Sequence, residues 1–139
     1  MVYEIDRNEL FQLIDEEVSR VAGVTYADSG VSLYDVIRIK SPDFPTIVRL
    51  EDDAIDHFVR RTMDICTVED SSLVFDVSDF DENNTEMTRR EITRYIVLNV
   101  CASWFLTAVR GRVEEYAKRA EEAMNKAITY LKTIKAPVR

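Results

Sequence analysis

The single histidine, His57, is the first residue to consider for catalytic or metal chemistry. It follows Asp53 by four residues, so both side chains would lie on one face of a helix and offer two ligands to a metal ion. Two ligands are too few for a zinc site, and acidic residues near the start of a helix are already explained by the helix dipole. No nucleophile motif accompanies His57, so a hydrolase triad is not supported. We expect no enzyme activity, with a small active site between His57 and the acidic segment 76–84 as a minor alternative.

That acidic segment partly matches the pattern of a calcium-binding loop. Asp79, Asp81 and Asn83 have the spacing of the first three ligands of such a loop. Asn84 then stands where the loop needs a glycine, and Arg90 stands where it needs a bidentate glutamate. We expect an acidic, solvated turn that precedes a helix and binds no metal.

Glycine and cysteine spacing give no support for a cofactor. A phosphate-binding loop needs clustered glycines, whereas Gly23, Gly30 and Gly111 are scattered. Cys66 and Cys101 lie in apolar helical patterns without a C-x-x-C spacing, which favours buried thiols over a disulfide or a metal pair. The sequence therefore predicts no cofactor and no metal.

Charge is divided unevenly along the chain. Residues 1–82 contain 20 Asp and Glu against 7 Lys and Arg, whereas residues 83–139 contain 6 against 11. The net charge of −8 conceals an acidic part and a basic part that could attract opposite ends of neighbouring copies. We expect head-to-tail self-association guided by this split, with attraction inside one subunit as the open alternative.

The basic part raises the question of nucleic acid binding. Arginines at 89, 90 and 94 and at 110, 112 and 119 could form a basic patch, but a sequence pI near 4.7 opposes a dedicated DNA-binding protein. We expect no sequence-specific nucleic acid and interpret these arginines as facing a protein partner or solvent. The candidate interface residues are Arg110, Arg112, Arg119, Tyr116 and Tyr130.

The 139 residues suit one domain, and hydrophobic residues at 46% are enough for one shared core. No apolar run of signal-peptide length stands at the start of the chain. The longest stretch without charge, residues 95–109, is short for a membrane span and contains Asn99, Ser103 and Thr107. We expect a cytosolic protein that does not enter a membrane.

Hydrophobic spacing in the first half predicts a helix over 7–22, started by Asp6 and Glu9 and ended by Gly23. Residues 33–50 are ambiguous; a hairpin of strands 36–40 and 46–50 is favoured over a short helix capped near Ser32. Acidic residues 51–53 would start a second helix over about 52–67. The alternation at Leu73, Phe75 and Val77 predicts a half-buried strand able to pair with the hairpin.

The second half predicts two long helices that pack together. A capping box at Thr88 and Glu91 precedes the uncharged stretch 95–109, which is apolar nearly all round and so is expected at the centre of the fold. After a break at 110–112, spacings of three and four residues indicate an antiparallel seam. The seam residues are Val113, Ala117, Ala120, Met124, Ala127, Leu131 and Ile134. The predicted fold is mainly α: a bundle of about four helices with a small hairpin or short sheet.

This order of elements resembles a family of phage proteins. The order is an acidic helical start, Ser32-Leu33-Tyr34-Asp35, the acidic residues 51–53, a strand, and two long helices with Trp104-Phe105 and a Pro137-Val138-Arg139 tail. It is similar to that of the head-tail connector (adaptor) proteins of tailed phages and prophages. The resemblance implies a non-enzymatic virion subunit that forms a ring with copies of itself, contacts portal or tail proteins, and lets DNA pass. The alternative is a small acidic soluble module for protein interaction or regulation.

Overall fold

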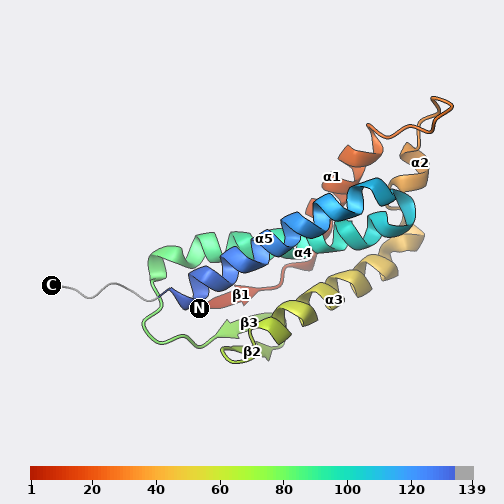
Figure 1. Ribbon diagram of the computed structural model, residues 1–139. Helices are drawn as coiled ribbons and strands as arrows, with labels where there is room; N and C mark the ends of the chain where they lie inside the picture. The colour runs from red at the N-terminus through yellow and green to blue at the C-terminus, as the bar shows by residue number, and fades with distance from the viewer. Residues whose placement is uncertain (134–139) are drawn as a thin grey trace.

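Helices dominate the protein, and a small sheet closes one end of the bundle (Figure 1). The structure is a computed structural model that describes residues 1–133. The elements are β1 (Val2–Glu4), α1 (Arg7–Ala22), α2 (Tyr34–Ile37), α3 (Phe44–Arg61), β2 (Cys66–Glu69), β3 (Ser72–Phe75), α4 (Thr85–Ala108) and α5 (Val113–Lys132), with short 3-10 turns at Ser41–Asp43, Glu82–Asn84 and Arg110–Arg112. The prediction of a mainly α bundle with a short sheet is confirmed.

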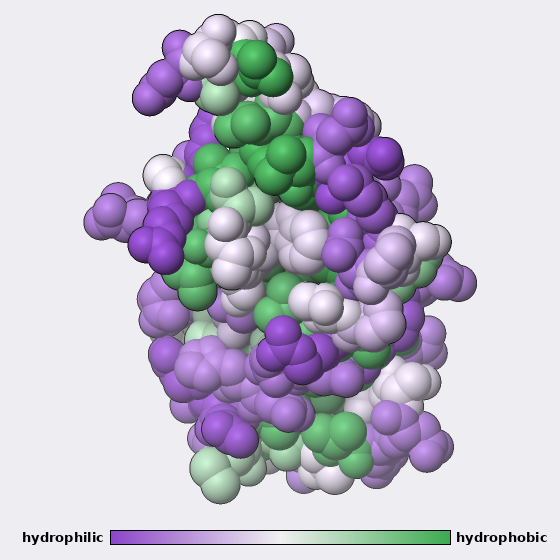
Figure 2. Space-filling view, turned by 90° about the vertical axis from the view of Figure 1, so that its right-hand side faces the viewer, coloured by the Kyte–Doolittle hydropathy of each residue, from purple (hydrophilic) through white to green (hydrophobic). Residues whose placement is uncertain are grey.

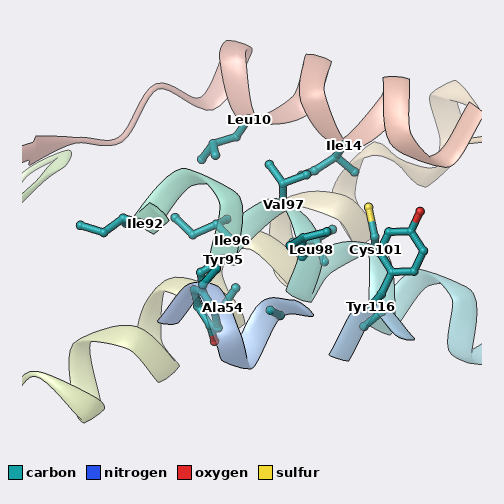
Figure 3. Close-up of a cluster of buried hydrophobic side chains, with 14 of the residues drawn as sticks. Leu10, Ile14, Ala54, Ile92, Tyr95, Ile96, Val97, Leu98, Cys101 and Tyr116 are labelled. Carbon is teal, nitrogen blue, oxygen red and sulfur yellow. The ribbon is translucent and has the colours of Figure 1, made fainter. Parts of the chain in front are cut away.

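Helix α4 lies at the centre of the bundle, as its lack of charge over residues 95–108 predicts. It packs against α5, α3 and α1, and buried side chains occur on every side of it. Figure 3 shows Leu10 and Ile14 of α1 and Tyr116 of α5 approaching Val97, Leu98 and Cys101 of α4, while Ala54 lies on α3. Within the described residues, no helix combines the length and the apolar character needed to cross a membrane.

Helices α4 and α5 form the predicted antiparallel pair, joined by the 3-10 turn at 110–112 (Figure 1). Ala120, Met124, Ala127 and Leu131 are buried in their contact, as expected. Val113 is half-buried and packs against the core, whereas the prediction is wrong for Ala117, which is exposed. Tyr116 and Ala123 are buried instead, since an ideal α-helix drifts relative to a strict seven-residue repeat. The remaining seam residue, Ile134, lies outside the described residues.

The sheet has three antiparallel strands in the order β1-β3-β2. Strand β3 is the predicted strand at 73–77, and it places Leu73 and Phe75 in the core. Its partners differ from the expected hairpin: Tyr3 of β1 lies opposite Leu73, and β2 pairs along the other edge. A two-residue turn joins β2 to β3, with Asp70 at a positive φ of 50°, a conformation that Asp tolerates better than most residues.

The hairpin predicted at 36–40 and 46–50 is wrong, and so is the helix start at 51–53. Residues 34–37 form the short helix α2, and α3 begins eight residues before the predicted start. Pro45 occupies the first turn of α3, where its fixed φ suits a helix and its missing N–H costs nothing. The buried residues of α3 are Ile47, Glu51, Ala54, Ile55 and Phe58. The helix ends at Arg61, and the next residue, Thr62, caps it, with its hydroxyl donating to the Phe58 carbonyl oxygen at 2.8 Å.

The helix over 7–22 is confirmed with the predicted bounds. Asp6 caps it, accepting hydrogen bonds from the backbone N–H groups of Asn8 and Glu9, both at 3.1 Å. The capping box predicted at Thr88 is wrong, because α4 already begins at Thr85 and the Thr88 hydroxyl donates to the Asn84 carbonyl oxygen at 2.7 Å.

Candidate contact surfaces

A groove of about 950 Å³ runs between α1 and α4. Strand β1 also lines it. Glu17 of α1 and Arg119 of α5 contribute to the lining as well. Apolar side chains on its walls include Leu10, Leu13 and Val97.

The two charged parts of the sequence meet in this groove. The acidic residues that the first part of the sequence contributes are Glu4, Asp6, Glu9, Glu16 and Glu17. The second part contributes the arginines Arg89, Arg90, Arg94 and Arg119, together with Glu86 of α4. Among the described residues, no ion pair within 4.0 Å joins an acidic residue of the first set to an arginine of the second. The arginines pair instead on their own helices: Arg89 with Glu86 at 2.8 Å, and Arg94 with Glu91 at 4.0 Å. Part of each charged half therefore lines the same groove within one subunit, without an ion pair between the two sets.

A hydrogen-bonded cluster near Arg119 ties α1 to α5. The Tyr116 hydroxyl donates to the Glu17 carboxylate and accepts from the Arg20 guanidinium at 2.9 Å. Burial and this hydrogen bond to Glu17 raise the pKa of Tyr116 to about 12. Burial alone would raise the pKa of Glu17, but hydrogen bonds from Arg20 and Tyr116 outweigh it and lower that pKa. We call Glu17, Arg20 and Tyr116 the α1–α5 clasp.

The five candidate interface residues have different surroundings. Arg110 is exposed in the turn between α4 and α5. Arg112 lies 3.3 Å from Glu115, and Arg119 lies 4.0 Å from the same residue. Tyr130 is half-buried near the end of α5.

Tyr116 does not lie on the surface as the candidate interface requires. Its ring is fully buried, edge-to-face with Phe105 at a centroid distance of 5.0 Å, and Arg119 covers it with its guanidinium carbon 5.3 Å from the ring centroid. A contact with another copy is therefore excluded for Tyr116, whose place is the α1–α5 clasp.

Sequence reasoning missed an exposed apolar surface at the end of the bundle that lies away from the sheet. Half of the large hydrophobic residues that are exposed among residues 1–133 belong to it: Val24, Tyr26, Val31, Tyr34, Val36 and Leu106. Figure 2, which faces this end, shows green hydrophobic surface on the projecting segment at the top and on the body below it. A turn signal was present in the sequence, because Asp28-Ser29-Gly30 stands between two apolar residues, Tyr26 and Val31.

The residues singled out for metal chemistry are not gathered into a ligand set. His57 is exposed on α3, with its ring stacked near Tyr95 at a centroid distance of 6.5 Å. Asp81 uses its carboxylate to accept the Asn83 backbone N–H at 3.1 Å, while Asp79 has a positive φ of 59° in the preceding turn. Over residues 1–133, no group of three or more His, Cys, Asp or Glu side chains is arranged to hold a metal ion.

Both cysteines are free thiols, Cys101 in the core and Cys66 at the start of β2. Burial raises the pKa of both, that of Cys101 to about 12. A high pKa keeps a thiol protonated at neutral pH, so neither cysteine has the properties of an activated nucleophile.

Comparisons with known proteins give no relative for this chain: no family model, no curated protein and no solved structure matches it.

Proposed function

We propose that this protein is a non-enzymatic structural subunit of a tailed phage or prophage, a head-tail connector that assembles into a ring with copies of itself. The observation that carries the proposal is the apolar surface at one end of a bundle whose core is otherwise well buried. A patch of this kind is typical of a protein contact. The proposal of a ring comes from the resemblance between the order of elements in this chain and that in connector proteins.

The charges of the described residues support a protein partner over tight binding of DNA. Four arginines of the basic half, Arg89, Arg94, Arg112 and Arg119, each lie within 4.0 Å of a glutamate on α4 or α5. Phosphate groups would have to compete with these carboxylates, and the net charge of −8 repels a polyanion. A ring through which DNA slides must not bind the phosphate groups tightly.

Electron microscopy of the concentrated protein tests the proposal. We expect closed rings of one size with a central channel, and native mass spectrometry should give one subunit number. A species that stays monomeric and binds one foreign protein tightly would contradict the ring and favour the small regulatory module. Filaments without closure would also contradict it, because a connector must form a closed contact around the DNA path.

A further inference from the structure

The segment between α1 and α2 forms an arm that extends beyond the bundle (Figure 1). Two backbone hydrogen bonds hold it as a small hairpin, from the Leu33 N–H to the Thr25 carbonyl oxygen at 3.0 Å and from the Ala27 N–H to the Val31 carbonyl oxygen at 2.8 Å. Gly30 has φ +86° in its turn, a conformation that other residues rarely adopt. The arm, residues 24–33, is thus a defined structure rather than an irregular loop.

Hydrophobic side chains on this arm face solvent. Val24, Tyr26 and Val31 are 60%, 59% and 63% exposed. Together they present roughly 300 Å² of surface, since a large side chain contributes on the order of 150–250 Å² when fully exposed. An arm that extends away from its own bundle cannot bury this surface within one subunit.

A second apolar surface lies at the same end of the molecule, on α2 and the end of α4. We call it the platform: Tyr34, Val36 and Leu106, which are 41%, 70% and 55% exposed. Trp104 fixes α2 against α4 by donating its indole N–H to the Ile37 carbonyl oxygen at 2.7 Å. This bond holds the α2 side of the platform against α4, and the platform also offers roughly 300 Å².

We propose that the arm of one copy packs on the platform of the next copy. Charge favours this arrangement, because Asp28 is the single charged residue of the arm and Arg110 lies next to the platform in the α4–α5 turn. Both are exposed, and neither has an ion-pair partner within 4.0 Å in residues 1–133. Between copies, Asp28 and Arg110 can pair at the edge of the apolar contact.

The geometry suits a ring, and the inference rests on the self-assembly proposed above. Arm and platform are different surfaces at one end, so each copy can contact two neighbours lying side by side at the same level. About 300 Å² per partner is below the roughly 800 Å² of a standard interface, so one contact is weak by itself. Ring closure gives every copy two such contacts and raises the apparent affinity.

Charge reversal tests the pairing of Asp28 with Arg110. Asp28→Arg and Arg110→Asp should each raise the protein concentration needed for half-assembly, measured by light scattering, at least tenfold. Mixing the two variants in equal amounts should restore assembly, because each arm then meets a platform of opposite charge. Asp53→Arg and Arg60→Asp, matched reversals on α3, should leave assembly unchanged.

Disulfide trapping tests the contact directly and does not require a stable ring. Asp28→Cys and Arg110→Cys, each in a Cys66→Ser background and with one variant carrying a size tag, should give a mixed disulfide dimer after mild oxidation.

Rings of normal stability in both reversal variants would overturn the inference while leaving the proposed function intact. Disulfide dimers that the Asp28→Cys variant forms only with itself would overturn it by indicating an arm-to-arm contact. A wild-type chain that is monomeric at every concentration, together with variants that give no mixed disulfide, would contradict both proposals.

Discussion

Replacing Tyr116 with Phe should weaken the fold by removing one hydroxyl from the α1–α5 clasp. The ring remains buried and keeps its edge-to-face contact with Phe105, so no cavity forms. The lost interaction is a hydrogen bond to the charged Glu17, a type that contributes about 1.5–3 kcal/mol, and Arg20 still pairs with Glu17 afterwards. We expect the free energy of unfolding to fall by about 1–2 kcal/mol.

Urea denaturation at pH 7 measures this loss, and Tyr130→Phe is the matched control on the same helix. Tyr130 is half-buried, and no side-chain hydrogen bond of its hydroxyl occurs within residues 1–133, so its loss should be below about 0.5 kcal/mol. A Tyr116→Phe penalty no larger than that of Tyr130→Phe would refute the clasp.

The clasp also predicts how the penalty depends on pH. The folded state lowers the pKa of Glu17, so the stabilisation is present above the ordinary glutamate pKa, near 4.3, and is lost as the pH falls through the lower folded value. For Tyr116 the folded pKa is raised to about 12, so its contribution is present below about 10 and is lost as the pH rises toward 12. The difference between wild type and Tyr116→Phe should therefore shrink at both extremes, and a pH-independent difference would contradict the ionic character of the clasp.

Three further predictions concern the core. Leu131→Ala should lower the free energy of unfolding by about 2–5 kcal/mol in a denaturant titration, because Leu131 is fully buried between α5 and its neighbours; a loss below about 0.5 kcal/mol would show that the seam is misassigned. Glu51 is buried, with one carboxylate oxygen unpartnered among residues 1–133 and Arg7 3.7 Å from the other. Burial raises the pKa of Glu51, so its charged form opposes folding above that pKa. The stability of the protein should therefore rise as the pH falls through the pKa of Glu51. Glu51→Gln should thus stabilise the protein at pH 7 and flatten this limb of the pH profile, whereas a large thermal destabilisation would show that the Arg7 attraction dominates. In the native protein at pH 8 a thiol reagent should modify Cys66 well before Cys101, whose pKa burial raises to about 12; equal rates by mass spectrometry would contradict a closed core.

Local patterns were sufficient to predict the elements with strong periodicity. The helix at 7–22 has both a capping aspartate and a regular apolar stripe, and α4 and α5 are long enough for their period to be unambiguous. The hairpin predicted within residues 33–50 is wrong because residues 41–45 between its two strands do not form a hairpin turn; Pro45 lies in the first turn of α3. Strand β2 was missed because Ile65 and Cys66 continue the helical spacing of α3, and only the end of that helix at Thr62 separates them from it.

The contact surfaces depend on tertiary structure that local patterns do not contain. The charge split was visible in the sequence, but the position of α1 beside α4 decides that both charges line one groove. Tyr116 was predicted at an interface because the apolar spacing assigned the buried position to Ala117, whereas the residue before it, Tyr116, is buried. The exposure of Val24 and Val31 follows from the direction in which the arm leaves the bundle, which no sequence period encodes.

Light scattering of the purified chain over a wide range of protein concentrations tests self-assembly, the central claim of this account, most directly. We predict a transition from a 16.1 kDa subunit to one larger species of fixed mass as the concentration rises. At 1 M salt, where the Debye length falls to about 3 Å, the transition should move to higher concentration without disappearing, because the arm and platform contact is mainly apolar. A mass that stays at that of the single subunit at every concentration and salt would contradict the claim.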